Sequence, residues 1–174
     1  MTTTIPQILV KRSSPDVRLP ERAYPTDSGL DVFAYELSKY YTADGFESPI
    51  SKEDLNLRWK RGEKITIGAG ERILISTGIM ATVGVGYEIQ VRPRSGLALK
   101  RGLTVLNTPG TIDEQYRNII GVIIINLSGV AQDITYGEKI AQLVVCPVVL
   151  SEVKEVTDLS ETARGLGGFG STNN

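Results

Sequence analysis

The chain ends in a glycine-rich segment whose side chains are suited to holding a nucleotide. Four of the six residues from 165 to 170 are glycine, which loses more backbone entropy on ordering than other residues, so no regular helix or strand is expected. Arg164 supplies a cation, Phe169 an aromatic ring, and Ser171 and Thr172 two hydroxyls. Guanidinium, hydroxyl and glycine N–H groups suit phosphate, and a ring suits stacking on a base. We interpret this segment as a lid that becomes ordered on a nucleotide.

Two nucleotide-binding motifs match the segment only superficially. Gly165, Gly167 and Gly170 fit G-x-G-x-x-G, but that fingerprint requires a preceding strand and a following helix. The segment also approaches a P-loop, with Ser171 in place of the required lysine and no helix after it. The plain alternative is a disordered tail without a role, which the cation and the ring argue against.

A basic stretch, RPRSGLALKRG, offers groups that could hold a phosphate. A strand is expected to end at Pro93, and Ser95 with Gly96 to open a turn or short helix. Free N–H groups at a helix start would join Arg94 in gripping a phosphate. A solvated basic patch explains the same residues, and this stretch alone does not decide between the two.

The stretch NTPGTIDEQYRN contains a candidate general base. Pro109-Gly110 predicts a turn and Thr111-Ile112 a brief strand, with Asp113 directly after it. A carboxylate in a tight loop can activate water. More often a turn aspartate bonds its own backbone, and a tyrosine such as Tyr116 packs.

Two further stretches, DSGLDVFA and GEKIAQLVV, stand out less. Gln142 in the second is polar within an apolar run, so it should be hydrogen-bonded, and a backbone partner is the plain alternative.

Composition restricts the chemistry. The chain has no histidine, which excludes Ser-His-Asp and Cys-His catalysis, and with one cysteine a zinc deaminase site is not expected. Catalysis must use carboxylates, lysine, tyrosine, serine or a hard metal, and Mg²⁺ fits because it takes oxygen ligands and substrate phosphates. Cys146 lies in the apolar run LVVCPVVL and is predicted to be buried and inert.

Length and charge indicate the class of protein. A chain of 174 residues is expected to form one domain. Its net charge of −1 does not favour a broad surface for nucleic acid or for an acidic membrane. No stretch approaches the ~20 apolar residues of a membrane span, so a cytoplasmic location is expected.

Short β-branched segments punctuated by glycine turns predict an all-β sandwich, jelly roll or barrel. The Gly68-Ala69-Gly70 turn separates the first two of these segments, and residues 85–91 alternate apolar and polar side chains. Strands are predicted over residues 64–67, 72–76, 85–91, 119–127 and 140–149.

Residues 36–62 interrupt this pattern, because they are polar, carry aromatic side chains and show no regular spacing. Ser51 would cap a short helix over 52–60, with Leu55 and Trp59 on one face. A structureless loop would exceed the ~12–15 residues that are usual, so we interpret the segment as an insertion or a subunit contact.

The five stretches together resemble the trimeric dUTPase family (deoxyuridine triphosphate nucleotidohydrolases). The resemblance rests on DSGLDVFA, PRSGLA, GTID-x-x-YR, G-E-K-I-A-Q-L and RG-x-GGFGST, in this order and spacing, and excludes only residues 36–62. It implies a jelly-roll-like β-barrel and a homotrimer with active sites shared between subunits. It also implies a core over residues 1–157, with the insertion, and a flexible glycine-rich C-terminal lid arm over 158–174.

The resemblance further implies a reaction and roles for residues. Asp113 falls on the aspartate that activates water for attack on the α-phosphate of dUTP, giving dUMP and pyrophosphate, which keeps uracil out of DNA and supplies dUMP for thymidylate synthesis. Tyr116 falls under the deoxyribose and leaves no room for a 2′-hydroxyl. Asn107 and the backbone from Gly110 to Ile112 fall on the hairpin that reads uracil, and hydrogen bonds there would reject cytosine.

The remaining family positions concern the triphosphate. Asp31 falls near the water shell of a triphosphate-bound Mg²⁺, and Phe169 would stack on uracil. Arg94, Ser95, Gly96 and Gln142 fall on phosphate-contacting positions. In the closing arm Arg164, Ser171 and Thr172 would meet the γ-phosphate, and Gly170 is a further substrate-binding position.

One departure and three alternatives accompany this interpretation. Asn118 stands where the family usually has glycine, which would alter the turn but leave Asp113 in register. The related dCTP deaminases share the fold and need a catalytic glutamate, for which Glu114 is the local candidate. A binding module that captures a regulatory protein through residues 36–62 is a second class. A plain structural jelly roll explains the strands but none of the five stretches.

Overall fold

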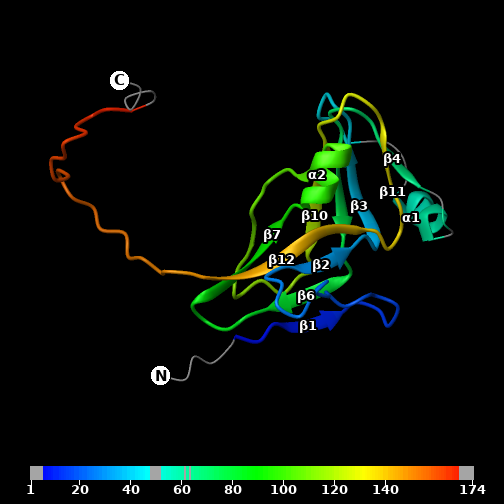
Figure 1. Cartoon of the computed structure of the whole chain (residues 1–174), viewed down its shortest axis with the longest axis horizontal. Helices are drawn as coiled ribbons and strands as arrows, with labels where there is room; N and C mark the ends of the chain where they lie inside the picture. Colours follow the sequence, from blue (N-terminus) through cyan, green and yellow to red (C-terminus); the bar gives the residue numbers. More distant parts are fainter. Residues whose placement is uncertain (1–5, 48–51, 61, 63, 169–174) are drawn as a thin grey trace.

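A computed structural model of the chain describes residues 6–47, 52–60, 62 and 64–168. Within this part, short strands dominate and two helices interrupt them (Figure 1), as the β-branched segments predict. The strands are β1 (Leu9–Arg12), β2 (Leu30–Phe33), β3 (Glu36–Tyr41), β4 (Ile65–Ile67), β5 (Arg72–Ser76), β6 (Ile79–Thr82), β7 (Tyr87–Arg92), β8 (Leu103–Val105), β9 (Gly110–Ile112), β10 (Gly121–Asn126), β11 (Gln132–Ile134) and β12 (Lys139–Pro147). The helices are α1 (Lys52–Lys60) and α2 (Ser95–Arg101).

The described strands form four antiparallel sheets whose partners often lie far apart in the sequence. The larger sheets have the orders β3-β5-β10-β8 and β2-β12-β7-β9, and the smaller ones pair β1 with β6 and β4 with β11. One cluster of buried apolar side chains includes Ile75 of β5 and Ile89 of β7, so both large sheets contribute to a single core. This arrangement agrees with the jelly-roll expectation, although the described strands do not close into one continuous barrel.

The alternation of side chains explains why these segments become strands. In β10 half-buried and buried positions alternate, so Val122 and Ile124 face the core. The predicted strands over 72–76, 85–91, 119–127 and 140–149 are confirmed as β5, β7, β10 and β12. The glycine turn after β4 separates it from β5, but the two strands pair with different partners.

Residues 36–62 are more regular than the sequence indicates. The helix over 52–60 is confirmed, but the segment begins with strand β3, which pairs with β5 in the core sheet. The register of β3 against β5 shifts between Leu37 and Lys39. A bulge of this kind interrupts the alternation of side chains between the two faces of a strand, so the sequence does not show it. Trp59 is 1% exposed, and its indole Nε1 donates to the Ile134 carbonyl at 3.0 Å. The proposed cap, Ser51, lies outside the described residues.

The C-terminal arm leaves the body of the molecule (Figure 1). Residues 151–168 are exposed and form neither helix nor strand. The arm residues Phe169, Gly170, Ser171 and Thr172 lie outside the described part. Neither described helix is long and apolar enough to cross a membrane.

The prediction that Cys146 is buried is wrong. Its thiol is half-buried near the end of β12, where the Arg92 Nη2 group donates to Sγ at 3.3 Å. The physical reason is that an apolar run does not show which of its residues a neighbouring strand covers. Strand β2 pairs with β12 only as far as Leu143, three residues before Cys146.

Candidate functional site

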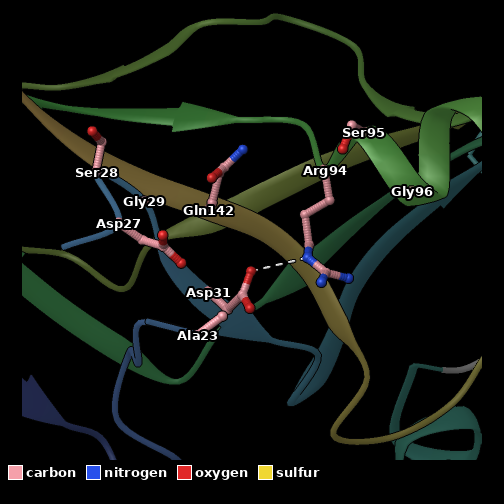
Figure 2. A pocket seen from close by; sticks show the side chains of 9 residues that line it. All are labelled: Ala23, Asp27, Ser28, Gly29, Asp31, Arg94, Ser95, Gly96 and Gln142. Atoms are coloured by element: carbon pink, nitrogen blue, oxygen red, sulfur yellow. Dashed lines mark hydrogen bonds and ion pairs between the residues drawn. The ribbon is translucent and has the colours of Figure 1, made fainter. Parts of the chain in front are cut away.

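A cavity of about 380 Å³ lies between the loop before β2 and the start of α2, with β12 beside it (Figure 2). Four of its lining residues, Arg94, Ser95, Gly96 and Gln142, are the phosphate positions that the sequence predicts. Asp31 also lines the cavity. No individual role was predicted from the sequence for the remaining four lining residues, three of which belong to the stretch DSGLD. These others are Ala23, Asp27, Ser28 and Gly29.

Strand register brings these distant residues together. On β12, Gln142 lies opposite Asp31 of β2 on one side and Arg92 of β7 on the other. β7 then ends, because Pro93 has no N–H for a ladder bond, and α2 begins two residues later. Arg94 precedes α2 in an extended conformation and makes no side-chain cap, which leaves Ser95 and Gly96 exposed at the helix start.

Arg94 is held in the cavity wall by two contacts. Its Nε donates to Asp31 Oδ1 at 2.9 Å, and its Nη1 donates to the Lys139 carbonyl at 3.2 Å. The Lys139 Nζ group lies 3.0 Å from Asp31 Oδ2 and 3.1 Å from Glu21 Oε1. These bonds, that to Asp31 first, raise the pKa of Lys139. The Asp31 carboxylate therefore sits between two cations.

Gln142 occupies space that only a glycine leaves open. Its Nε2 donates to the Pro93 carbonyl at 3.0 Å, which is the backbone partner that the sequence left as an alternative. A Cβ on Gly29 would lie 2.0 Å from Gln142 Oε1, so the amide rests directly against the bare glycine.

The third stretch places Asp113 and Tyr116 on a turn after β9. The Tyr116 N–H donates to the Asp113 carbonyl at 3.0 Å, and the Tyr116 hydroxyl donates to the Ile119 carbonyl at 2.9 Å. Asp113 is exposed, and no side-chain or backbone donor of the described residues bonds its carboxylate. The expected alternative, a carboxylate bonded to its own turn, is therefore absent from the described structure. Thr82, which sequence reasoning missed, donates from Oγ1 to the Glu114 carbonyl at 2.9 Å and anchors this turn to β6.

The single chain does not bring all the predicted site residues into one cavity. Asp113 lines a separate cavity of about 400 Å³, and Tyr116 lines another of about 330 Å³. Asn107 is exposed beside Gly110, where a Cβ would lie 3.3 Å from the Asn107 amide nitrogen. In the arm, Arg164 donates from Nε to the Gly167 carbonyl at 2.9 Å and does not line the cavity in Figure 2.

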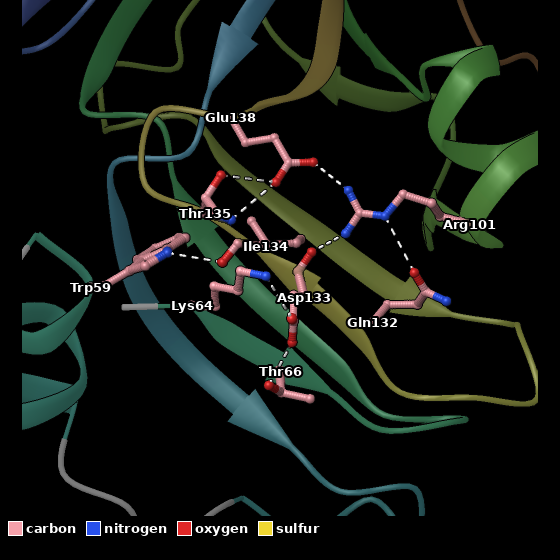
Figure 3. A network of polar contacts seen from close by, with 9 residues as sticks. All are labelled: Trp59, Lys64, Thr66, Arg101, Gln132, Asp133, Ile134, Thr135 and Glu138. Atoms are coloured by element: carbon pink, nitrogen blue, oxygen red, sulfur yellow. Dashed lines mark hydrogen bonds and ion pairs between the residues drawn. The ribbon is translucent and has the colours of Figure 1, made fainter. Parts of the chain in front are cut away.

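The helix that carries Ser95 is fixed at its other end by Arg101 (Figure 3). The Arg101 guanidinium forms an ion pair of 2.5 Å with Glu138 and donates to the Asp133 carbonyl and the Gln132 side chain. Gly102 closes the helix in a left-handed conformation, with φ 64°.

Metal-ligating side chains do not cluster in the described part of the chain, since no three acidic, cysteine or histidine residues could jointly hold an ion there. Both Asp31 oxygens accept bonds from cations, although each carboxylate oxygen retains a further lone pair for water.

Comparison with known proteins decides the family. A family model described as dUTPase matches residues 54–173. The chain belongs to the dUTPase family. A deoxyuridine 5'-triphosphate nucleotidohydrolase of a Hydrogenobaculum species is 45% identical over 166 residues, which cover 95% of this chain and 97% of that protein. The corresponding protein of Clostridium novyi is 42% identical, with coverages of 95% and 98%.

Solved dUTPase structures share the fold. A mutant dUTPase of Staphylococcus bacteriophage 80alpha with dUpNHpp superposes with a TM-score of 0.71 at 25% identity, covering 95% of this chain and 97% of that one. A second mutant of the same phage enzyme gives 0.72 at 26% identity, with coverages of 99% and 100%. The match to the dUTPase family model begins inside α1 and does not include the strands before this helix. The alignment with the Hydrogenobaculum relative is longer and covers 95% of the chain.

Proposed function

We propose that this dUTPase-family chain hydrolyses dUTP to dUMP and pyrophosphate in the cytoplasm, which keeps uracil out of DNA and supplies dUMP for thymidylate synthesis. One observation carries the proposal: the four residues outside the C-terminal arm that the family resemblance assigns to phosphates, Arg94, Ser95, Gly96 and Gln142, all line one cavity. The guanidinium, the hydroxyl and the amide there suit phosphate oxygens.

In this proposal Asp113 activates the attacking water. Its exposed carboxylate has no donor from the described residues, so its lone pairs are available to a water molecule. The α-phosphate would be attacked by that water, the water's proton would pass to the carboxylate, and pyrophosphate would leave. Arg94 and the start of α2 would bind the phosphate charge, so that catalysis consists mainly of positioning and charge stabilisation.

Base and sugar selection belong to the hairpin around β9. Asn107 and the backbone from Gly110 to Ile112 would bond uracil, and cytosine would leave buried donors mismatched. Gly110 supports this role, because it packs closely between Asn107 and Val91. Tyr116 would lie under the deoxyribose, with its hydroxyl held by Ile119, and would exclude a 2′-hydroxyl.

We also propose a homotrimer with shared active sites. Support comes from the three separate cavities that hold the phosphate residues, Asp113 and Tyr116 in one chain. Neighbouring subunits would complete each site, and the exposed arm would close over it with Arg164, Phe169, Gly170, Ser171 and Thr172.

Mg²⁺ fits this site as an ion that arrives on the triphosphate. Asp31 would contact it through water, since its oxygens already accept bonds from Arg94 and Lys139. The ion would neutralise phosphate charge when bound.

A pyrophosphate-release assay with Mg²⁺ and dUTP, dTTP, dCTP or UTP tests the function. We expect release from dUTP alone among the four. Ammonia release from dCTP would replace the proposal with a deaminase that uses Glu114, and an equal rate with UTP would contradict the role of Tyr116.

The regulatory partner at residues 36–62 stays a prediction. In the described structure this segment also contributes to the core, because deleting residues 39–61 would remove half of β3 and the buried Trp59. Surface substitutions on this segment, rather than deletion, are the appropriate test for lost binding of a partner.

A further inference from the structure

Charged side chains of alternating sign lead from the surface to the cavity in Figure 2. Arg18 Nη2 lies 3.2 Å from Glu21 Oε1, which lies 3.1 Å from Lys139 Nζ. Lys139 Nζ lies 3.0 Å from Asp31 Oδ2, and Asp31 Oδ1 lies 2.9 Å from Arg94 Nε. The exposed fraction of the side chain falls from 52% at Arg18 to 13% at Asp31. Two cations contact Asp31. Arg94 lines the cavity, whereas Lys139 does not.

Lys139 contacts Arg94 by two routes. Its carbonyl oxygen accepts from Arg94 Nη1 at 3.2 Å, while its ammonium group neutralises the carboxylate oxygen that Arg94 does not use. Nη2 of Arg94 has no acceptor among the described residues, and Arg94 itself lines the cavity. With Lys139 in place, Arg94 therefore bonds Asp31 through Nε alone.

The position of Lys139 is itself fixed. Glu21 and Asp31 form a backbone bridge, with N–H to carbonyl distances of 3.2 and 2.7 Å, so two carboxylates bracket the ammonium group. The ammonium also lies 5.9 Å from the centre of the Phe33 ring, and Arg18 Cζ lies 3.6 Å from the same centre. Such a bracketed cation is held in one place, in contrast to a lone surface lysine.

We propose that Lys139 is a positioning residue for phosphate binding, which keeps Asp31 from gripping Arg94 through two nitrogens and so leaves Arg94 Nη2 for a substrate phosphate. The inference rests on the proposed function. Without the ammonium, a carboxylate beside a guanidinium favours the two-nitrogen arrangement, in which Asp31 would also accept from Nη2 and compete with a phosphate for it.

The test compares Lys139→Met, Lys139→Gln and Lys139→Arg with the matched control Lys64→Met, which removes an exposed ion pair to Asp133 outside the cavity. We expect the Met and Gln variants to raise KM for dUTP about tenfold with kcat changed less, the scale of one lost charge-assisted hydrogen bond. Arginine should restore KM to within about threefold, and the control should match wild type.

A second readout does not depend on turnover. In ¹⁵N-labelled protein without nucleotide, the exchange of the Arg94 Nε–H with water should change in Lys139→Gln and Lys139→Met but not in Lys139→Arg. Wild-type exchange together with wild-type KM in the Gln variant overturns the inference. If wild-type protein releases no pyrophosphate from dUTP, the proposed function fails, while the exchange measurement still decides whether Lys139 positions Arg94. Thermal unfolding of each variant identifies any that does not fold, and the remaining variants then decide.

Discussion

At the scale of single residues, the side chains that line the cavity are held in place by bonds to the protein. Arg94 uses Nε and Nη1 for protein contacts, and Gln142 uses its amide nitrogen for Pro93, so both side chains are oriented before any ligand arrives. Asp113 differs, because its carboxylate is exposed and has no donor from the described residues. This contrast suits groups that position phosphates and a group that acts on water.

Asp113→Asn should separate binding from chemistry. An amide of nearly the same shape cannot accept the proton from water, so turnover of dUTP should fall at least ~10²-fold, the usual scale for losing a general base. Binding of a non-hydrolysable dUTP analogue, measured by calorimetry, should stay near the wild-type affinity. Near-normal turnover in the pyrophosphate assay would refute the assignment.

Gly29→Ala should displace Gln142. The new Cβ would lie 2.0 Å from Gln142 Oε1, so the Gln142 side chain must move, and its Nε2 would lose the bond to the Pro93 carbonyl. We expect KM for dUTP to rise and the free energy of unfolding to fall by about 1 kcal/mol, the net value of one hydrogen bond. Gly129→Ala is the matched control, because a Cβ there meets open space. Equal effects of the two substitutions would show that the Gly29–Gln142 contact has no special role.

At the scale of elements, α2 is short and depends on its neighbours for its position. Isolated helices of seven residues are not stable in water, so tertiary contacts must hold α2. Leu97 packs into the core, and Arg101 joins the C-terminal end of the helix to β11 and to the turn before β12 (Figure 3). The two ends of α2 therefore link the cavity in Figure 2 to this polar network.

Arg101→Met should loosen that link. The substitution removes the ion pair to Glu138 and the bonds to Asp133 and Gln132, and leaves Glu138, which is 20% exposed, without its cation. We expect the free energy of unfolding in urea to fall by about 2–3 kcal/mol. Lys39→Met, which removes an exposed ion pair to Glu47, should cost less than about 1 kcal/mol. Similar losses in both variants would contradict the clamp.

At the scale of the whole molecule, one chain carries the parts of a site without assembling them. The residues assigned to phosphates outside the arm, Asp113 and Tyr116 line different cavities, and the exposed residues 151–168 line none of these cavities. The proposed completion by neighbouring subunits would explain both observations.

Truncation after Ala163 should leave the fold intact, because the described residues that it removes are exposed and form no strand or helix. Loss of the arm's cation and hydroxyls should lower kcat/KM for dUTP by about 10²-fold, as for two lost charge-assisted bonds. Circular dichroism checks the fold, and unchanged kcat/KM would disprove the lid.

Light scattering should give the mass of a trimer, three times 18.9 kDa. The expectation follows from sites that need more than one subunit. A monomer with full activity would contradict shared sites.

The sequence alone determined the residue types, the family and six of the twelve described strands. Without histidine and with one cysteine, only carboxylate, hydroxyl, lysine or hard-metal chemistry was open, and the five stretches identified the candidate residues. Strand segments such as 72–76 were predictable because β-branched residues and glycine turns act locally.

Only the tertiary structure decided which residues meet. Asp31, Gln142 and Arg92 share one row because three strands distant in sequence pair in a particular register, which no local pattern encodes. The same pairing placed Lys139 behind Asp31. A bulge hid β3, and the role of Trp59 in the core depended on a carbonyl 75 residues away. Local preferences specify elements, whereas hydrogen-bond register and packing between distant segments specify the site.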